Sequence, residues 1–370
     1  MKFYYILLAL LIPVALLFSG CVTQEQQETI KIGFVGPLSG DMSVYGISSK
    51  GGMQLAADDM NWTINGKKIE FVYEDGKCDA KASTEAFSKL INVDGVKYIL
   101  GPVCSSELLA GASLAENAKV INIGSATTSP KLHEAGVYSF AMYPLDDSEG
   151  KFNAEFIVSK LGKKNVAMLT CLSDWCKGYE EPMKKTIEAL GGKLLILEHN
   201  EKGAKDLKTQ LTKIKETNPD VLFAVEYPEE FANLVPQAKE LGLNTTFYIP
   251  QMITEDTLRT MGSDVEGFYT VKADVVLKDQ NAFLERLKQK TDLPTPEIDL
   301  TAGRSYDALF MLKNAIEKAD SFDTEVIKDT LLTIKYDGIT GHHEFDKDGT
   351  PATSNYKVLR VVNGQFVQQN

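Results

Sequence analysis

The feature that most constrains the fold of this chain is a regular alternation of short apolar runs with longer amphipathic segments. Runs such as Ile30–Val35 and Val96–Leu100 are too short for helices and end in Gly-Pro turns, which is typical of buried strands. The segments between such runs, for example Ala80–Ile91, carry apolar residues at helical spacing. Because strands that alternate with helices form parallel sheets covered on both faces, the sequence predicts an α/β fold.

The same pattern starts again after Asp146-Asp147-Ser148, which indicates a second lobe. A chain of 370 residues is long enough for about two domains. We therefore predict two doubly wound parallel-sheet lobes. The strands and helices expected in the second half of the pattern are Lys151–Leu161, Val166–Thr170, Tyr179–Leu190, Lys193–Leu197, Lys205–Lys215, Val221–Val225, Glu229–Leu241 and Thr246–Ile249.

The later part of the chain has a different character. Thr301–Lys318 and Thr324–Thr333 have the length and periodicity of helices. Val358–Val362 and Gln365–Val367 flank Asn363-Gly364, a strong signal for a two-residue hairpin turn. A helical pair and a β-hairpin are therefore expected after the alternating segments.

An export signal stands at the start of the sequence. Met1-Lys2 precedes the apolar run Phe3–Phe18, which is shorter than the ~20 residues that span a bilayer as a helix. The ending Leu17-Phe18-Ser19-Gly20-Cys21 resembles the lipobox of exported lipoproteins, and this resemblance implies that Cys21 carries lipid. An uncleaved membrane anchor is the alternative. In either case residues 22–29 form a polar tether, and the protein is anchored to the membrane outside the cytoplasm.

The charge distribution argues against nucleic acid as a partner. The formal net charge is -12. Nucleic-acid sites need a basic stripe and arginine side chains, whereas this chain is acidic and poor in arginine. Its arginines are Arg259, Arg286, Arg304 and Arg360.

If Cys21 carries lipid, the cysteines that remain are even in number, which favours disulfides in an exported chain. The spacing from Cys171 to Cys176 suits a small closed loop and leaves Cys78 to pair with Cys104. A zinc site made of these thiolates is the competing interpretation, but neither pair has CxxC spacing.

The segment Tyr98–Glu107 is the strongest candidate for a binding loop. An apolar strand runs into Gly101-Pro102 and then into Ser105 and Ser106, which open a helix. The backbone N–H groups of a helix's first turn bind anions, and open α/β sheets bind ligands at the carboxyl ends of their strands. The two serines are therefore expected to face a ligand. An ordinary capped helix is the alternative.

Several segments together resemble the branched-chain amino acid (Leu/Ile/Val) binding proteins of ABC transporters, the type I periplasmic-binding-protein family. The resemblance covers nearly all of the mature chain, and the order and spacing of its segments carry it. These segments are Ile32–Gly40, Tyr45-Gly46, Tyr73–Cys78 and Gly101–Ser106.

The resemblance implies two lobes joined by a hinge of three crossovers, which close on a small ligand. Lobe one is expected over 30–147 plus 274–342, and lobe two over 148–273 plus 343–370. The implied function is a lipid-anchored receptor that delivers its ligand, an amino acid or a related amide or carboxylate, to an ABC transporter permease. A sensory ligand-binding protein is the alternative, and neither an enzyme nor a cofactor is expected.

The resemblance also implies the residues of the site. The ligand's carboxylate falls on Ser105, on the backbone of Ala126 and Thr127, and on Thr128. The aromatic walls fall on Tyr45, Trp175 and Tyr227. Hydroxyls and backbone donors at helix starts can satisfy a buried carboxylate with charge-assisted hydrogen bonds.

One position departs from the family pattern. Where the amino acid binders carry a glutamate for the ligand's ammonium group, this chain has Gln251. An amide accepts through its carbonyl but supplies no charge, and an unpaired ammonium in a closed cleft is costly. Glu226 is our expected ammonium partner and Asp174 a possible substitute. An amino acid is the expected ligand, and an amide or an acid without an amine is the alternative.

Other chemical signals are weak. His342-His343-Glu344-Phe345-Asp346 matches no standard metal site and is interpreted as a solvated turn. The sequence has no GxSxG, GxGxxG or GxxxxGK word, so esterase, dinucleotide-binding and P-loop functions have no support.

Overall fold

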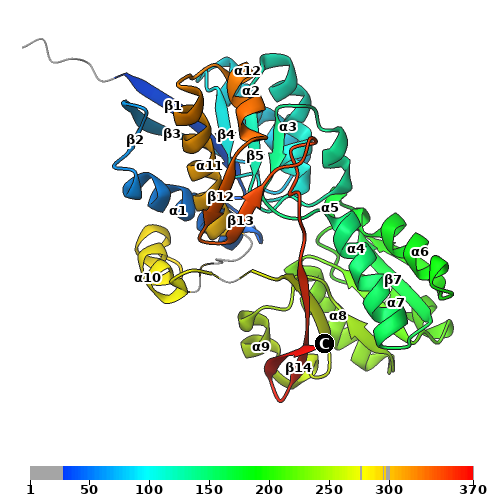
Figure 1. Cartoon of the computed structure of the whole chain (residues 1–370). Coiled ribbons are helices and arrows are strands. Elements are labelled where there is room, and N and C mark those ends of the chain that lie inside the picture. The colour runs from blue at the N-terminus through cyan, green and yellow to red at the C-terminus, as the bar shows by residue number, and fades with distance from the viewer. Residues whose placement is uncertain (1–27, 276, 295, 297–300, 370) are drawn as a thin grey trace, which may run out of the picture.

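The computed structural model describes residues 28–275, 277–294, 296 and 301–369, which form two α/β lobes (Figure 1). The signal peptide, Cys21 and most of the tether lie outside the described residues, so their roles stay predictions. Within the described part of the chain, no helix has both the length and the apolar character needed to cross a membrane.

The first lobe is built on a six-stranded sheet with the order β2-β3-β1-β4-β5-β6. Only β2 is antiparallel to its neighbour. The strands are Thr29–Gly36 (β1), Thr63–Ile64 (β2), Lys67–Asp75 (β3), Tyr98–Leu100 (β4), Ile121–Gly124 (β5) and Ser139–Ala141 (β6). Successive residues of β1 pack into different clusters, Phe34 into one and Val35 into another, because helices cover both faces of the sheet.

Two helical layers enclose this sheet. On one face α1 packs against α11, with α10 and α12 beside them, and on the other face α2 packs against α3. A side chain at Gly52 would collide with the carbonyl group of Ala302, so glycine allows α1 to approach the start of α11 closely. The helices are Ser43–Asp59 (α1), Ala80–Asn92 (α2), Ser105–Ala118 (α3), Gln280–Thr291 (α10), Gly303–Ala319 (α11) and Thr324–Leu331 (α12).

The second lobe contains a seven-stranded sheet with the order β15-β14-β11-β10-β9-β7-β8. Its central strands are parallel, while β14 is antiparallel to both β11 and β15. The strands are Asn165–Cys171 (β7), Lys193–Asn200 (β8), Val221–Val225 (β9), Thr246–Tyr248 (β10), Tyr269–Ala273 (β11), Tyr356–Val362 (β14) and Gln365–Gln369 (β15). The predicted hairpin around Asn363-Gly364 is confirmed as β14 and β15.

The helices of the second lobe pack in pairs on this sheet. Contacts join α4 to α6 and α7 to α8. A single turn of 3-10 helix, Gly262–Val265, follows α9 and packs on α8. The helices are Asp146–Glu155 (α4), Asp174–Gly178 (α5), Glu180–Ala189 (α6), Lys208–Glu216 (α7), Pro228–Glu240 (α8) and Glu255–Met261 (α9).

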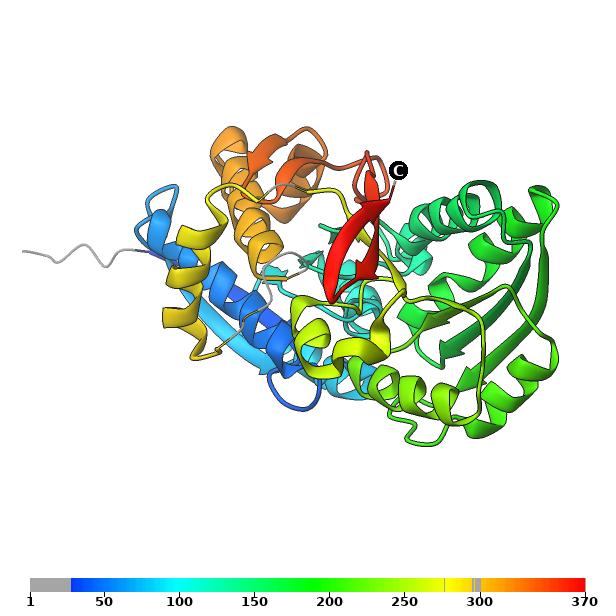
Figure 2. The same cartoon turned by 90° about the horizontal axis from the view of Figure 1, so that it is seen from below.

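The chain passes between the lobes three times. Figures 1 and 2 show the late strand β14, in red, returning to the second lobe after the orange helices of the first. The expected boundaries at 147/148 and 342/343 fall inside α4 and inside β13, a strand over Gly341–Glu344 that pairs with β12, Lys335–Gly338. Phe345 still packs in the core of the first lobe. The turn after it also stays on the first lobe, because Phe345 pairs with Pro351 and the carbonyl oxygen of Gly349 accepts from the N–H of Ala141 in β6. We therefore propose that the first and third crossovers lie at residues 142–145 and 352–355.

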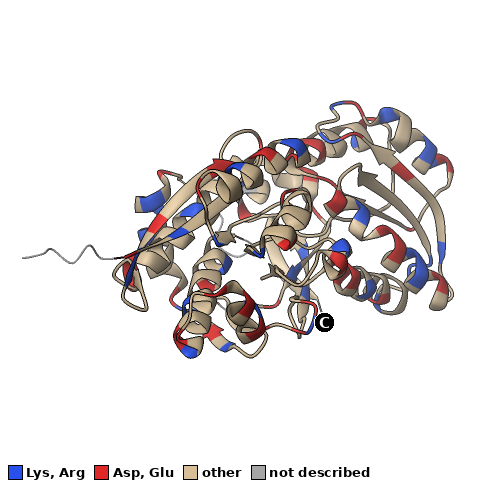
Figure 3. Ribbon diagram, turned by 90° about the horizontal axis from the view of Figure 1, so that it is seen from above, with Lys and Arg blue, Asp and Glu red and all other residues tan. Residues whose placement is uncertain are grey.

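Charged residues are spread over both lobes. Figure 3 shows blue and red segments interspersed along the helices of each lobe. His343, from the stretch considered for metal binding, is buried and its Nε2 lies 3.0 Å from Asp307 Oδ2. This histidine therefore has a packing role between β13 and α11, which differs from the solvated turn expected there.

Candidate functional site

The strand order places one switch point in each sheet, and the two switch points face the same space between the lobes. In the first sheet the order changes direction between β1 and β4, and in the second between β7 and β9. Open α/β sheets bind ligands at the carboxyl ends of strands at such points. The segments that follow these four strands carry Met42, Val103, Trp175 and Tyr227.

These loops enclose a cavity of about 30 Å³. Of the predicted site residues, those that line it are Tyr45, Ser105, Ala126, Trp175, Tyr227 and Gln251. This volume is enough for about one water molecule. An open cleft of about 610 Å³ lies beside the cavity and shares Tyr45 and Met252 with it. A larger ligand therefore requires the walls of the cavity to move apart, and the cleft gives it a way in.

The hydroxyl of Ser105 is oriented by two backbone groups. Ser105 Oγ accepts from the N–H groups of Thr128 and Ser129, each at 3.1 Å. Because its oxygen is already an acceptor twice, the hydroxyl is left with its proton to donate. Ser105 is 1% exposed and lines the cavity, so its proton suits an acceptor such as a carboxylate oxygen.

Thr127 and Thr128 are buried and do not line the cavity. Thr128 Oγ1 lies 3.0 Å from Asp146 Oδ2. Thr127 Oγ1 has no hydrogen-bond partner within the described ranges. In this structure Thr128 therefore supports Ser105 through its backbone N–H, while its hydroxyl is turned toward Asp146.

The aromatic wall of the second lobe is formed by Trp175 and Tyr227, whose ring centroids are 4.9 Å apart. Trp175 lies in α5, a one-turn helix in which Ser173 Oγ accepts from the N–H of Cys176 at 3.1 Å. The predicted disulfide between Cys171 and Cys176 is confirmed and closes this turn. The cap and the disulfide together fix the backbone that carries Trp175.

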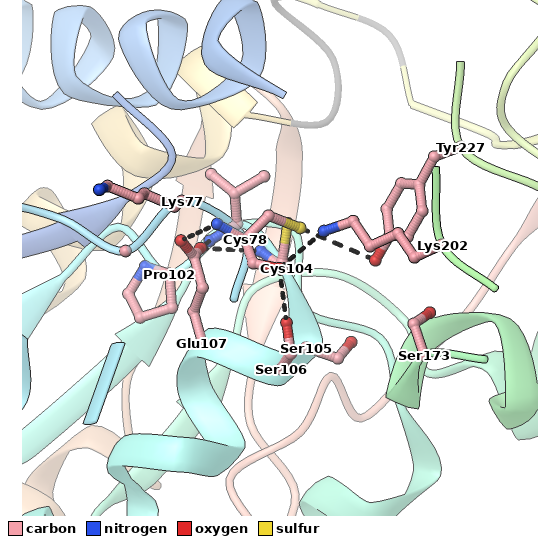
Figure 4. The surroundings of a disulfide bond; sticks show 12 residues. Lys77, Cys78, Pro102, Cys104, Ser105, Ser106, Glu107, Ser173, Lys202 and Tyr227 are labelled. Atoms are coloured by element: carbon pink, nitrogen blue, oxygen red, sulfur yellow. Dashed lines mark hydrogen bonds between the residues drawn. A yellow bond between two sulfur atoms is a disulfide. The ribbon is translucent and has the colours of Figure 1, made fainter. Parts of the chain in front are cut away.

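The second predicted disulfide, between Cys78 and Cys104, is also confirmed (Figure 4). Glu107 holds both half-cystines, because its carboxylate accepts from the N–H of Cys78 at 3.0 Å and from that of Cys104 at 3.1 Å. Burial raises the pKa of Glu107 to about 7.

The start of α3 differs in detail from the prediction. The N-cap residue is Cys104, and Ser105 is the first residue of the helix. Ser106 does not line the cavity, and its Oγ lies 3.4 Å from the carbonyl oxygen of Cys78. Of the two serines expected to face a ligand, only Ser105 reaches the cavity.

The two lobes touch each other around this cavity. Lys202 Nζ donates to the carbonyl oxygen of Cys78 at 2.7 Å, and Tyr227 Oη lies 3.8 Å from Cys78 Sγ (Figure 4). Asp174 forms an ion pair with Lys131 of the first lobe at 2.7 Å. Met42 and Val103 belong to the same hydrophobic cluster as Trp175 and Met252. The lobes are therefore in a closed arrangement.

Behind the cavity Gln251 joins a buried polar group. Its Nε2 lies 2.8 Å from Glu149 Oε2 and 2.9 Å from the hydroxyl oxygen of Tyr179, which in turn donates to Glu149 Oε1 at 2.7 Å. Burial raises the pKa of Glu149 to about 7, although the hydrogen bonds from Tyr179 and Gln251 oppose this shift. Burial and the nearby Glu149 also raise the pKa of Asp146.

Glu226, the expected ammonium partner, is not among the residues that line the cavity. It is fully buried, and its Oε2 accepts from Asn200 Nδ2 at 3.0 Å. Burial raises its pKa to about 8. The structure thus places this carboxylate against Asn200 rather than at the cavity wall.

Sequence reasoning missed several cavity residues and the group behind them. Val103 and Cys104 could have been added because they share the loop of Ser105. Met252 follows Gln251, and Met42 stands between Gly40 and Tyr45, so both could have been added as neighbours of positions that the resemblance marks. Glu149 reads as the polar first turn of a helix, and only the fold shows that it is buried.

Two α/β lobes that are joined by three crossovers and that close on a cavity at their switch points define a two-lobed solute-binding protein. A model of the family described as "Periplasmic binding protein" matches residues 29–365. The chain therefore belongs to the periplasmic binding protein family.

Relatives and solved structures agree with this assignment. The chain is 28% identical over 328 residues to the leucine-, isoleucine-, valine-, threonine- and alanine-binding protein of Pseudomonas aeruginosa, covering 87% of each chain. It is similar to a leucine-binding protein from Thermotoga maritima, with a TM-score of 0.82, 26% identity and coverage of 92% of this chain and 98% of the other. A Streptococcus pneumoniae binding protein in complex with isoleucine gives a TM-score of 0.78, 26% identity and coverage of 92% and 100%.

Proposed function

We propose that this protein is a receptor that captures an amino acid with an apolar side chain between its two lobes and delivers it to an ABC importer. The observation that carries the proposal is the cavity at the two switch points, with three aromatic side chains, the Ser105 hydroxyl and the Gln251 amide around it. The names of the relatives, which bind leucine, isoleucine and valine, support the ligand class. No step of covalent chemistry is needed.

Different residues contact the polar and the apolar parts of the ligand. Ser105 donates its hydroxyl proton to the ligand's carboxylate, with the backbone of Ala126 beside it. The backbone N–H of Thr128 orients Ser105, and Thr127 belongs to the same loop. Tyr45, Trp175 and Tyr227 cover the apolar part of the ligand. Closure then removes the ligand from water, which strengthens each polar contact.

Family membership implies a location outside the cytoplasm. We propose in addition that lipid on Cys21 anchors the protein to the membrane through the tether 22–29. A Cys21→Ser variant that stays in the membrane fraction of expressing cells would contradict this anchor, whereas release into the soluble fraction is expected.

Ligand binding can be tested directly. Protein purified without denaturation is extracted and its bound small molecules are identified by mass spectrometry. Calorimetric titration then follows with leucine, isoleucine and valine and with their amine-free counterparts 4-methylpentanoate, 3-methylpentanoate and 3-methylbutanoate. Saturable binding of at least one member is expected, and a protein that binds none of them contradicts the proposed function.

A further inference from the structure

The orientation of the Gln251 side chain is determined by its neighbours. Tyr179 gives its only proton to Glu149 Oε1, so the tyrosine oxygen can only accept from Gln251. An ionised Glu149 carboxylate likewise accepts and cannot donate. The group of Gln251 that faces both neighbours must therefore be the NH₂ group, and the alternative orientation would leave two acceptors facing each other.

This orientation turns the carbonyl oxygen of Gln251 away from the buried group. Both protons of Nε2 are used, one on Glu149 and one on Tyr179. Gln251 lines the cavity, whereas Glu149 and Tyr179 do not. Among the residues that the structure describes, none donates to Gln251 Oε1. The amide thus presents an acceptor on its cavity side.

The backbone conformation of Gln251 is also typical of a binding-site residue. Gln251 has a φ of 62°, in the left-handed region that non-glycine residues rarely adopt. Strained residues of this kind persist where the surrounding structure fixes them, and they cluster at binding sites. This backbone conformation places the Gln251 side chain between the cavity and the buried Glu149.

We infer that the site takes a ligand with a positively charged primary amine, which donates to Gln251 Oε1 while the carboxylate of Glu149, one layer behind, supplies the balancing charge. This inference rests on the proposed function and deepens it by naming the group that is recognised. Glu149 is a positioning residue: it fixes the amide and polarises it. The negative charge that the amino acid binders carry at the position of Gln251 is thus supplied in this chain by Glu149.

Burial is consistent with this role. Glu149 is fully buried, and the groups that face it are Tyr179, Gln251 and Asn153, with the carboxyl of Asp146 close by. In the part of the chain that the structure describes, no lysine or arginine lowers the pKa of Glu149. A cation at Gln251 would therefore give this carboxylate a partner of opposite charge.

The other acidic candidates are engaged elsewhere. Asp174 pairs with Lys131 at the rim between the lobes. Glu226 bonds to Asn200, although its Oε1 has no partner within the described part of the chain. Glu226 therefore serves as a matched control, because it is another buried glutamate that can be changed to glutamine.

The exchange of charge between two positions gives a sharp test. In Glu149→Gln one of the two carboxylate oxygens, which accept from Tyr179 and Gln251 separately, is replaced by an NH₂ group that only donates. One of these two hydrogen bonds is therefore lost or reversed, and the negative charge is removed. The double variant Glu149→Gln with Gln251→Glu returns the charge and places it at the cavity wall. Dissociation constants are measured by calorimetry for leucine, isoleucine, valine and their three amine-free counterparts.

The expected results separate charge recognition from a structural role. Glu149→Gln should weaken binding of the amino acids about 10- to 100-fold, as for loss of a hydrogen bond to a charged group, and change the amine-free acids less than about 3-fold. The double variant should return amino acid binding to within about 5-fold of the original protein. Glu226→Gln should change neither series by more than about 3-fold.

Other outcomes overturn the inference in distinguishable ways. Equal losses for both ligand series, or no loss for either, reject charge recognition by Glu149. A selective loss in Glu226→Gln assigns the amine to Glu226 instead. If the original protein binds the acids as tightly as the amino acids, the receptor function stands and the inference fails. If it binds neither series, both fail. Should Glu149→Gln not fold, Gln251→Met decides instead: it removes Oε1, so it should weaken binding of the amino acids and not of the amine-free acids, and equal effects on both series reject the inference.

Discussion

Lys202 Nζ lies 2.7 Å from the carbonyl oxygen of Cys78, and this hydrogen bond joins the second lobe to the first beside the cavity. Lys202 also lies 4.8 Å from the ring centroid of Tyr227, so its ammonium group covers an aromatic wall of the site. The contact exists only when the lobes are closed. It therefore contributes to the equilibrium between open and closed forms.

The first prediction concerns this contact. Lys202→Met keeps an apolar stem over Tyr227 and removes the hydrogen bond, so closure should lose about 0.5–1.5 kcal/mol. Because affinity scales with the population of the closed form, the dissociation constant should rise by up to about 10-fold. Small-angle scattering should show a larger radius of gyration without ligand. Lys205→Met is the control, since Lys205 faces Glu229 within the same lobe. An unchanged dissociation constant for Lys202→Met would show that the contact has no role in closure.

The second prediction uses the two tryptophans. Trp175 should change its fluorescence on ligand binding, and Trp175→Ala should weaken binding by about 2 kcal/mol or more, as for a buried aromatic anchor. Trp62 is the internal control, because its Nε1 donates to Asp58 and its ring packs on Phe71 in the first lobe. A Trp62→Phe variant isolates the signal of Trp175. A ligand response that comes only from Trp62 would place the binding site elsewhere.

The third prediction compares the two disulfides. Loop-closure entropy assigns about 2 kcal/mol to a bridge as short as Cys171–Cys176 and about 3.5 kcal/mol to one spanning as many residues as Cys78–Cys104. Replacing Cys171 and Cys176 by alanine should therefore lower the free energy of unfolding less than replacing the other pair. The same variant should weaken ligand binding, since the bridge fixes the turn that carries Trp175. Urea unfolding and calorimetry measure the two effects, and a variant with normal affinity would reject the link to the site.

The fourth prediction concerns pH. Burial raises the pKa of Glu149 to about 7 and that of Glu226 to about 8, above the value of about 4.3 for an unfolded glutamate. Between these values the folded protein holds more protons than the unfolded chain. Its free energy of unfolding without ligand should therefore fall as pH rises from about 5 to 8. Urea unfolding at several pH values tests this.

Glu149→Gln and Glu226→Gln should each make this pH dependence shallower. A free energy of unfolding that increases steadily from pH 5 to 8 would show that these carboxylates do not carry raised pKa values. Glu325 has a lowered pKa of about 2 and contributes only at lower pH, so it does not obscure the result.

The alternation of strands and helices was sufficient to predict the α/β class. Buried parallel strands such as Val221–Val225 are continuous apolar runs, and the observed β9 has the predicted bounds. By contrast Ser139–Ala141 (β6) is too short to show a period, and Lys335–Glu344 forms a hairpin from mostly polar residues. β6 forms because it pairs with β5, and the hairpin, whose strands pair locally, is fixed to the first lobe by the contact of His343 with Asp307 of α11.

The candidate site was predicted in part for a similar reason. A family resemblance can assign a ligand-binding role to single residues such as Ser105 and Trp175, and the structure brings these two to one cavity. It could not show how Gln251 is oriented, because that depends on Tyr179 and on Glu149, which lie far from Gln251 in the sequence. Burial of an acidic residue in the first turn of a helix has no signature in a single sequence.

The position of β14 has a consequence for how the protein is made. This strand is the antiparallel partner of β11, and β15 adds to its outer edge. A nascent chain that has not yet reached residue 356 leaves the backbone groups of β11 without that partner, and such an edge invites pairing with other chains. The second lobe therefore cannot complete its sheet until the whole first lobe has been synthesised. A chaperone that covers the edge of β11 until then would raise the yield of folded protein.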